Sequence, residues 1–334
     1  NPILITNHSN LKKVSKLSKS FHIFKEEKFI KYLKSSKLKN IETSYEFLNL
    51  NMYMRLSNFL NVSETKINIS KYMGIKTSKE IKNIESCHIE DGLAVLKFII
   101  ELKQKKINPK NEYEVSEILY KKRKEGINFF RNSFDYISAF DSNAAIVHYK
   151  PHPEKSLSSK NRNLLLIDSG AQYLEGTTDI TRVIKIGEKN LSRIKFSYTY
   201  LLKSLIRIEN KIFPRNIRTS EIDLFIRKYL SKFNITYNHG TGHGVGNFGD
   251  VHEKYPIISS RSNDNLIKNA LFSIEPGYYV EGQFGLRIEN LYVTKNINNS
   301  LKLKNVTLVP YDLDLVNFKL ITNFERNYIK KYHR

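Results

Sequence analysis

The pattern of apolar and polar positions changes along the chain at about Ile81. Residues 1–75 are rich in Lys, Ser and Asn, and apolar residues recur at helical spacing there only in two short patches, 26–37 and 45–60. Residues 86–103 carry apolar side chains at helical spacing with acids near the start, which predicts a helix. Residues 111–126 predict a second amphipathic helix that ends at Gly126.

Strand and helix patterns alternate in the rest of the chain. Residues 135–151 are strand-like with a turn, and the apolar run in 164–183 predicts a buried strand. Two further helices are expected at 191–212 and 220–233, and the last third reads as β-rich. This order favours an α+β protein with two similar halves packed on one curved sheet, although no sequence repeat is evident.

Composition is compatible with a large folded domain. The chain has 334 residues, of which 40% are hydrophobic and 12% aromatic, and its apolar runs are much shorter than a membrane span. Cys87 is the one cysteine, which excludes a disulfide framework and a thiolate metal cluster and fits a reducing compartment.

The formal net charge of +22 raises the question of a nucleic-acid partner. The positive residues are mostly Lys and are scattered, which is typical of solvated faces, so nucleic acid is not the expected partner. The chain begins at Asn1 without a Met, and a targeting segment ahead of it stays an alternative.

Acids and histidines follow several strand-like stretches. Asp168 ends the apolar run 164–167, and Asp179 lies eleven residues later. An Asp after a strand is often a turn former, and a lone His is often a hydrogen-bonded core residue. Glu289, in "GLRIENLYV", is interpreted as a strand residue among apolar neighbours, where an unpaired carboxylate would be costly and needs a cation. The remaining candidates are His239 and His243 in "HGTGHG" and Glu275 in "SIEPGYY".

Together these residues suit a metal site. Four carboxylates and one imidazole without thiols fit manganese or cobalt, with zinc or iron as alternatives. Two ions about 3.5–4 Å apart would lower the pKa of a shared water, whereas four facing acids without metal would repel and take up protons. The glycines around His243 are expected to let the backbone approach a substrate closely, and no following helix pattern supports a nucleotide-binding loop.

The segments that carry these residues resemble one known family. They are "DSGAQYLEGTTDITR", "HGTGHGVGNFGDVHE" and "EPGYYVEGQFGLRIEN", with further similarity in "NAAIVHYKP" and "TLVPYDLDLV". They look like the pita-bread metallopeptidases, most closely the eukaryotic cytosolic type of Xaa-Pro aminopeptidase, and the similarity spans roughly residues 85–334.

The resemblance implies a fold and a domain division. Residues 81–334 would form a pita-bread catalytic domain with two pseudo-symmetric halves on a curved antiparallel sheet. Residues 1–80 would be the remnant of a creatinase-like N-terminal domain. The first domain of the family's three-domain layout, whose arginine contacts the peptide, is expected to be absent.

The resemblance also implies two divalent metal ions per chain, with manganese as the first choice and cobalt or zinc as alternatives. Asp168 would bind one ion, and His243 and Glu275 would bind the other. Asp179 and Glu289 would bridge both ions.

The implied reaction removes the N-terminal residue from peptides with proline in second position, by attack of a metal-bridging hydroxide on the Xaa-Pro carbonyl. Glu275 would take the proton from the water and pass it to the leaving proline nitrogen. His148 and His252 would hydrogen-bond the scissile carbonyl or the tetrahedral intermediate, and His239 would lie near the proline pocket.

Two further residues match positions near the ligands in the family. Tyr279 and Arg287 would support the ligands or bind substrate, and packing on a strand is nearly as good an explanation for both. The family's cytosolic members are homodimers, so a cytoplasmic homodimer without membrane association is expected.

Three other hypotheses remain open at this point. A prolidase acting on Xaa-Pro dipeptides, or another pita-bread peptidase such as a methionine aminopeptidase, would use the same ligands. A metal-free pita-bread scaffold that binds RNA or histones would suit the positive charge. A catalytically idle remnant would follow from the short N-terminal region.

Overall fold

The computed structural model describes residues 3–6, 21–189 and 191–334. The chain divides into two units, Asn1–Ile69 and Ser70–Arg334, and each is described by itself. Among the described residues no helix has the length and apolar character needed to cross a bilayer.

The first unit is small, and its described residues form two short parallel strand pairs and two helices. β1 (Ile3–Ile5) pairs with β2 (His22–Phe24), and β3 (Asn40–Thr43) pairs with β4 (Asn61–Glu64). The two helical patches expected from the sequence correspond to α2 (Glu26–Ser35) and α3 (Leu50–Ser57). A small apolar cluster packs them together: Ile30, Leu33, Leu56 and Leu60.

The second unit begins with α4 (Ile69–Gly74), α5 (Ser78–Lys103) and α6 (Glu112–Lys124). α5 starts eight residues earlier than the apolar pattern indicated, because Thr77 and Glu80 form a reciprocal capping box at its N-terminus. α6 agrees with the predicted helix, and its N-cap Asn111 accepts a hydrogen bond from the backbone N–H of Glu114.

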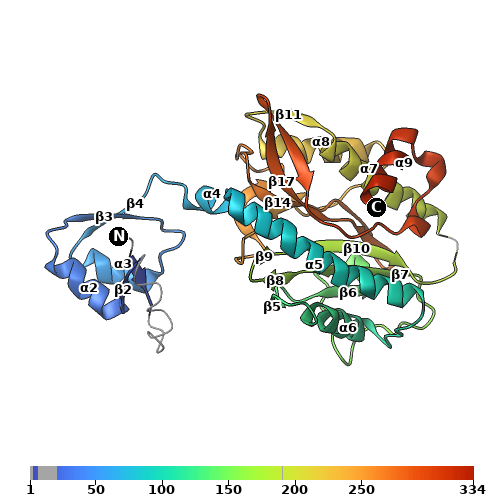
Figure 1. Cartoon of the computed structure of the whole chain (residues 1–334), viewed down its shortest axis with the longest axis horizontal. Coiled ribbons are helices and arrows are strands. Elements are labelled where there is room, and N and C mark those ends of the chain that lie inside the picture. Colours follow the sequence, from blue (N-terminus) through green and yellow to red (C-terminus); the bar gives the residue numbers. More distant parts are fainter. Residues whose placement is uncertain (1–2, 7–20, 190) are drawn as a thin grey trace. The chain divides into compact units, whose positions relative to one another are not determined.

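The helix pair α5 and α6 packs beside a three-stranded antiparallel sheet in the order β10–β7–β6 (Figure 1). These strands are Ile180–Lys185, Leu164–Ser169 and Ile137–Phe140. A second short sheet has the order β5–β8–β9 (Phe129–Asn132, Ala171–Tyr173, Gly176–Thr177). The strand-like prediction for 135–151 holds only for β6, since Asp141–Ala145 form a 3-10 helix.

A second helix pair, α7 (Ser192–Glu209) and α8 (Thr219–Ser231), packs on a larger antiparallel sheet and confirms both predicted helices. Its six strands have the order β11–β18–β17–β14–β12–β13. Their bounds are Ile212–Pro214, Ser300–Asn305, Asn290–Ile297, Leu271–Ile274, Gly242–Gly244 and Glu253–Ile258. β15 (Gly277–Val280) and β16 (Phe284–Arg287) form a hairpin between β14 and β17 in the chain.

The C-terminal region differs from the β-rich prediction. After β18 the chain forms 3-10 turns at Leu313–Leu315 and Phe318–Leu320 and then α9 (Asn323–Tyr332). Thr322 and Glu325 form a capping box that starts α9. Ile329 joins the same core cluster as α7 and α8, so tertiary packing stabilises a helix of low overall hydrophobicity.

Candidate metal centre

Asp168 lies in a strand, and Asp179 lies directly before the strand that pairs with it. Asp168 is in β7, and Asp179 immediately precedes β10. The two strands are antiparallel, with Asp168 opposite Thr181. The β8–β9 hairpin between them reverses the chain at Leu174–Glu175, which brings the second acid back to the first.

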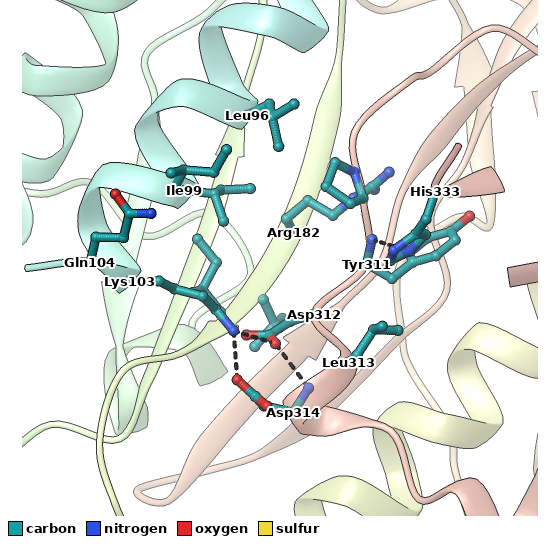
Figure 2. Close-up of a pocket in the computed structure, with 14 residues that line it drawn as sticks. Leu96, Ile99, Lys103, Gln104, Arg182, Tyr311, Asp312, Leu313, Asp314 and His333 are labelled. Atoms are coloured by element: carbon teal, nitrogen blue, oxygen red, sulfur yellow. Dashed lines mark hydrogen bonds and ion pairs between the residues drawn. The ribbon is translucent and has the colours of Figure 1, made fainter. Parts of the chain in front are cut away.

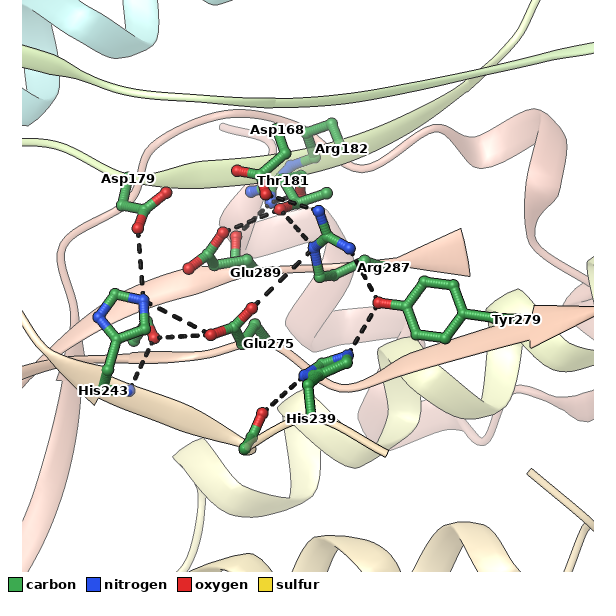
Figure 3. A network of polar contacts seen from close by, with 12 residues as sticks. Asp168, Asp179, Thr181, Arg182, His239, His243, Glu275, Tyr279, Arg287 and Glu289 are labelled. Carbon is green, nitrogen blue, oxygen red and sulfur yellow. Dashed lines mark hydrogen bonds and ion pairs between the residues drawn. The ribbon is translucent and has the colours of Figure 1, made fainter. Parts of the chain in front are cut away.

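Three other sequence-predicted residues reach the same place from the larger sheet. His243 is in β12, Glu275 directly follows β14, and Glu289 lies in the connection between β16 and β17. The interpretation of Glu289 as a strand residue is therefore wrong, since the chain leaves the β16 ladder at Arg287 and joins the next one at Asn290. Figure 3 shows the five side chains directed toward one another.

Several carboxylate oxygens at this centre are buried and have no hydrogen-bond donor among the residues that the structure describes. They are Oδ1 of Asp168, Oδ1 of Asp179 and Oε1 of Glu289. One ligand atom from each of these residues lies within 4.8 Å of the others, and the same holds for His243, Glu275 and Glu289. Buried acceptors without donors are costly, so this convergence fits a cation at the centre.

The orientation of His243 supports the same conclusion. Nδ1 lies 3.0 Å from the carbonyl oxygen of Gly244, so Nδ1 carries the proton and donates it. Nε2 is then unprotonated and carries a free lone pair, and it lies 3.5 Å from Oδ2 of Asp179 and 3.5 Å from Oε1 of Glu275. Burial and the nearby His252 lower the pKa of His243 to about 3, which keeps the imidazole neutral. A neutral nitrogen facing two carboxylates is what a shared cation requires.

The carboxyl groups are strongly perturbed. Burial, followed by the charges of Glu289 and Asp168, raises the pKa of Asp179 well above its ordinary value. Burial and then Glu275 and Asp168 do the same to the pKa of Glu289. Burial raises the pKa of Glu275 to about 8, against the opposing effect of Arg287. Without a cation these groups would hold protons, and a cation would favour their charged forms.

A chain of polar contacts connects the acids to His239. Arg287 donates from Nη2 to Oδ2 of Asp168 (2.6 Å) and from Nη1 to the hydroxyl of Tyr279 (2.8 Å). That hydroxyl is 2.8 Å from Nε2 of His239, whose Nδ1 lies 2.7 Å from the carbonyl oxygen of Gly240. Nδ1 therefore donates to Gly240 and Nε2 accepts from Tyr279. Burial is the main reason that the pKa of His239 falls to about 4.

His148 and His252 lie at the exposed side of the centre. The ring of His252 packs edge-on to His243, with centroids 4.2 Å apart. Burial lowers the pKa of both His239 and His252, and the charge of His148 contributes in the same direction to each. A nitrogen of His252 also falls within the group formed with Asp179 and His243.

Sequence reasoning missed three residues that hold the predicted ones. Thr181 donates to Oε2 of Glu289 (2.8 Å), and the hydroxyl of Ser273 lies between the backbone N–H of His243 (3.1 Å) and Glu275 (3.5 Å). Thr181 follows Asp179 by two residues and Ser273 precedes Glu275 by two, so the alternation of side-chain directions along a strand could have identified both. Arg227 of α8 donates to the carbonyl of His239 (2.6 Å), and no local pattern signals that contact.

Two of the glycines beside His243 are needed for strand packing. A Cβ on Gly242 would lie 1.9 Å from the carbonyl oxygen of Ser273, and one on Gly244 would lie 2.1 Å from that of Tyr255. These two glycines allow β12 to approach its neighbours β14 and β13 closely, and the expected approach of the backbone to a substrate stays a prediction.

Two helix pairs on antiparallel sheets, with an acid-and-histidine centre between them, define a hydrolase-like metal-binding protein. Residues 83–296 match the model of metallopeptidase family M24, and the chain belongs to this family.

Curated relatives are named probable Xaa-Pro aminopeptidase P. The Sordaria macrospora protein is 36% identical over 285 residues, which are 81% of this chain and 46% of that relative. The Paracoccidioides brasiliensis protein is 37% identical over 286 residues, 81% of this chain and 46% of the relative. The chain thus spans about half the length of the curated relatives it matches.

Solved structures of aminopeptidases are also similar to this chain. An X-prolyl aminopeptidase from Caenorhabditis elegans, described as a cytosolic enzyme with a di-nuclear active site, superposes with a TM-score of 0.83 at 28% identity, covering 96% of this chain and 55% of that one. An X-Pro aminopeptidase from Thermotoga maritima gives a TM-score of 0.77 at 26% identity, covering 93% and 86%. The expected α+β pita-bread fold is confirmed.

Proposed function

We propose that this chain is the catalytic part of a dinuclear-metal Xaa-Pro aminopeptidase, which removes the N-terminal residue from peptides with proline in second position. The observation that carries the proposal is the lone pair of His243 Nε2, which faces the carboxylates of Asp179 and Glu275 at 3.5 Å each. The names of the relatives supply the substrate class.

Five residues are proposed to hold two divalent ions. Asp168 would hold one ion, His243 and Glu275 the other, and Asp179 and Glu289 both. The oxygen-rich donor set favours manganese, with cobalt or zinc as alternatives. When bound, such ions lower the pKa of water and polarise a carbonyl.

The side chains around the acids would bind and orient the peptide. Glu275 is half-buried and would accept the proton of the attacking water and deliver it to the proline nitrogen. The exposed rings of His148 and His252 would donate to the carbonyl oxygen of the scissile bond. His239 would contact the proline, in an orientation fixed by Tyr279 and Gly240.

The residue before proline would occupy a cavity of about 500 Å³ next to His252. Phe130, Arg131, Ser133, Gln172 and residues 248–252 line this cavity. Its exposed aromatic side chains, Phe130 and Phe248, pack edge-on with centroids 5.5 Å apart.

The wider assignment is part of the same proposal. Residues 81–334 would be the pita-bread catalytic domain, and residues 1–80 would belong to a creatinase-like N-terminal domain. The description of the Caenorhabditis elegans relative as cytosolic supports a cytoplasmic location. A homodimer is proposed from the family resemblance, and sedimentation of the purified chain tests it.

Turnover of an Arg-Pro-Pro peptide tests the activity. Manganese-loaded protein should release free arginine, and chelated protein should not. Glu275→Gln should abolish release, whereas Glu281→Gln, in the exposed β15–β16 turn, should retain it. Cleavage of Xaa-Pro dipeptides alone would indicate a prolidase, and salt-sensitive RNA binding without turnover would indicate a non-catalytic scaffold.

A further inference from the structure

Arg182 is a buried cation without an acidic partner. It lies in β10 beside Thr181, and only 2% of its surface is exposed. Within the described part of the chain it forms no ion pair with a carboxylate, and its N–H groups donate to neutral oxygens. Burial of a charge is costly unless its hydrogen bonds are satisfied, so the position needs an explanation.

The inner side of the guanidinium holds the turn that carries Glu289. Nη1 donates to the carbonyl oxygen of Glu289 (2.7 Å) and Nη2 to Oδ1 of Asn290 (2.8 Å). The backbone N–H of Glu289 donates to the carbonyl oxygen of Thr181 (3.2 Å), and Thr181 Oγ1 donates to Glu289 Oε2 (2.8 Å). Glu289 lies outside both adjacent ladders, so these contacts with Thr181 and Arg182 position the carboxylate and leave Oε1 without a donor.

The outer side of the guanidinium is held by the C-terminal region. Nε and Nη2 donate to the carbonyl oxygen of Val309 (3.2 and 2.7 Å), and Nη2 also reaches the hydroxyl of Tyr332, the last residue of α9 (3.0 Å). The Tyr332 hydroxyl donates in turn to the carbonyl oxygen of Thr307 (2.8 Å). The ring of Tyr311 lies 4.8 Å from the guanidinium carbon, in cation–π contact.

A surface groove of about 330 Å³ borders this outer side. Figure 2 shows Arg182 and Tyr311 across from the α5 residues Leu96 and Ile99. The groove gives a shorter side chain at position 182 room to rearrange, so a conservative replacement should be tolerated by the fold.

We propose that Arg182 is a positioning residue for the metal centre, and that α9 sets the affinity for the two ions that Glu289 would bridge by holding Arg182 through Tyr332. The proposal rests on the proposed function. Its physical basis is the planar guanidinium fork, which reaches Glu289, Asn290 and Val309 together, whereas a lysine ammonium cannot satisfy all three. A structural role alone would attach α9 to the sheet without any influence on metal binding.

Calorimetric titration of the metal-free protein with Mn²⁺ provides the test, together with the visible absorption spectrum of the Co²⁺-loaded protein. Arg182→Lys keeps the charge and loses the fork, and it should weaken the binding of the ions that Glu289 would bridge roughly tenfold. The Co²⁺ spectrum should change, and kcat should fall while KM stays within about twofold. Arg193→Lys is the matched control, because its guanidinium lies near the surface and contacts the Tyr278 hydroxyl (3.2 Å) and the Phe284 ring.

Tyr332→Phe is the second variant and keeps the proposal testable if Arg182→Lys does not fold. It removes only the hydroxyl and should weaken the binding of the ions at Glu289 about threefold. The loss of affinity in the double variant should be smaller than the sum of the two single losses. Ion affinities equal to those of the unsubstituted protein in both variants would overturn the inference. If the unsubstituted protein itself binds no divalent ion, the proposed metal function fails instead.

Discussion

The guanidinium of Arg287 donates to Oδ2 of Asp168 at 2.6 Å, while Oδ1 of the same carboxylate is buried and has no donor. The two oxygens of one acid therefore have different surroundings. One is fixed by a permanent cation of the protein, and the other is directed to the centre where Asp179 and Glu289 also present oxygens without donors. The first contact orients the carboxylate of Asp168, and it leaves the second oxygen available for an ion.

Metal removal should destabilise the protein. Chelation would leave four neighbouring carboxyl groups without their cations, so the melting temperature should fall and should recover when Mn²⁺ is added. An ion present at 100 times its dissociation constant contributes about 2.7 kcal/mol to the free energy of unfolding. Scanning calorimetry at increasing Mn²⁺ checks this, and Glu289→Gln should show a much smaller shift than Glu281→Gln.

Tyr279→Phe should lower kcat/KM about tenfold without loss of metal, because charge-assisted hydrogen bonds contribute roughly 1.5–3 kcal/mol. The hydroxyl of Tyr279 accepts from Arg287 and donates to His239, so its loss leaves His239 without a fixed orientation. Peptidase kinetics and elemental analysis on the same samples check both parts. Tyr278→Phe, one residue away, should behave like the unsubstituted protein, and a loss of metal in Tyr279→Phe would contradict the assigned role.

Asp91→Asn should reduce the free energy of unfolding by about 3–5 kcal/mol, because it leaves a buried charge uncompensated. Arg123 is fully buried, and it donates to both oxygens of Asp91 (2.7 and 3.1 Å) between α5 and α6. Urea unfolding measures the change. Asp135→Asn is the control, since the side chains of Asp135 and its partner Lys150 are 90% and 80% exposed and their pair should contribute close to nothing.

Glu209 should make stability fall as the pH rises. Burial raises its pKa above the ordinary value of 4.5, although Tyr328 and Asn305 donate to its carboxylate and oppose the shift. Because the pKa is higher in the folded state, the folded protein binds the proton more tightly than the unfolded chain. This contribution is complete below pH 4.5 and is lost as the pH rises through the folded-state pKa. The side chain in Glu209→Gln cannot titrate, so this variant should lose less stability than the unsubstituted protein between pH 5 and 8. Urea unfolding measures the free energy of unfolding at each pH, and equal slopes of this free energy against pH in the two proteins would contradict the prediction.

The local sequence was sufficient to predict α6, α7 and α8, because their apolar positions repeat at helical spacing over three or more turns. It was insufficient for the start of α5, which depends on the Thr77–Glu80 cap, and for α9, whose buried residues are few. Boundaries and short helices depend on individual hydrogen bonds and on packing partners that lie far away in the chain.

For the candidate site, too, one part could be predicted from the sequence and another part depended on the tertiary structure. The sequence by itself identified the acids and histidines that together suit a metal site, since an unpaired carboxylate next to an apolar run is costly wherever the chain places it. Only the tertiary structure decided that β7, β10, β12, β14 and the β16–β17 connection deliver those residues to one centre. It also decided which oxygens remain without donors and that Arg182, Thr181 and Arg227 hold the ligands and His239 in place. These contacts join residues as far as 108 positions apart, and no local pattern specifies a hydrogen bond over that separation.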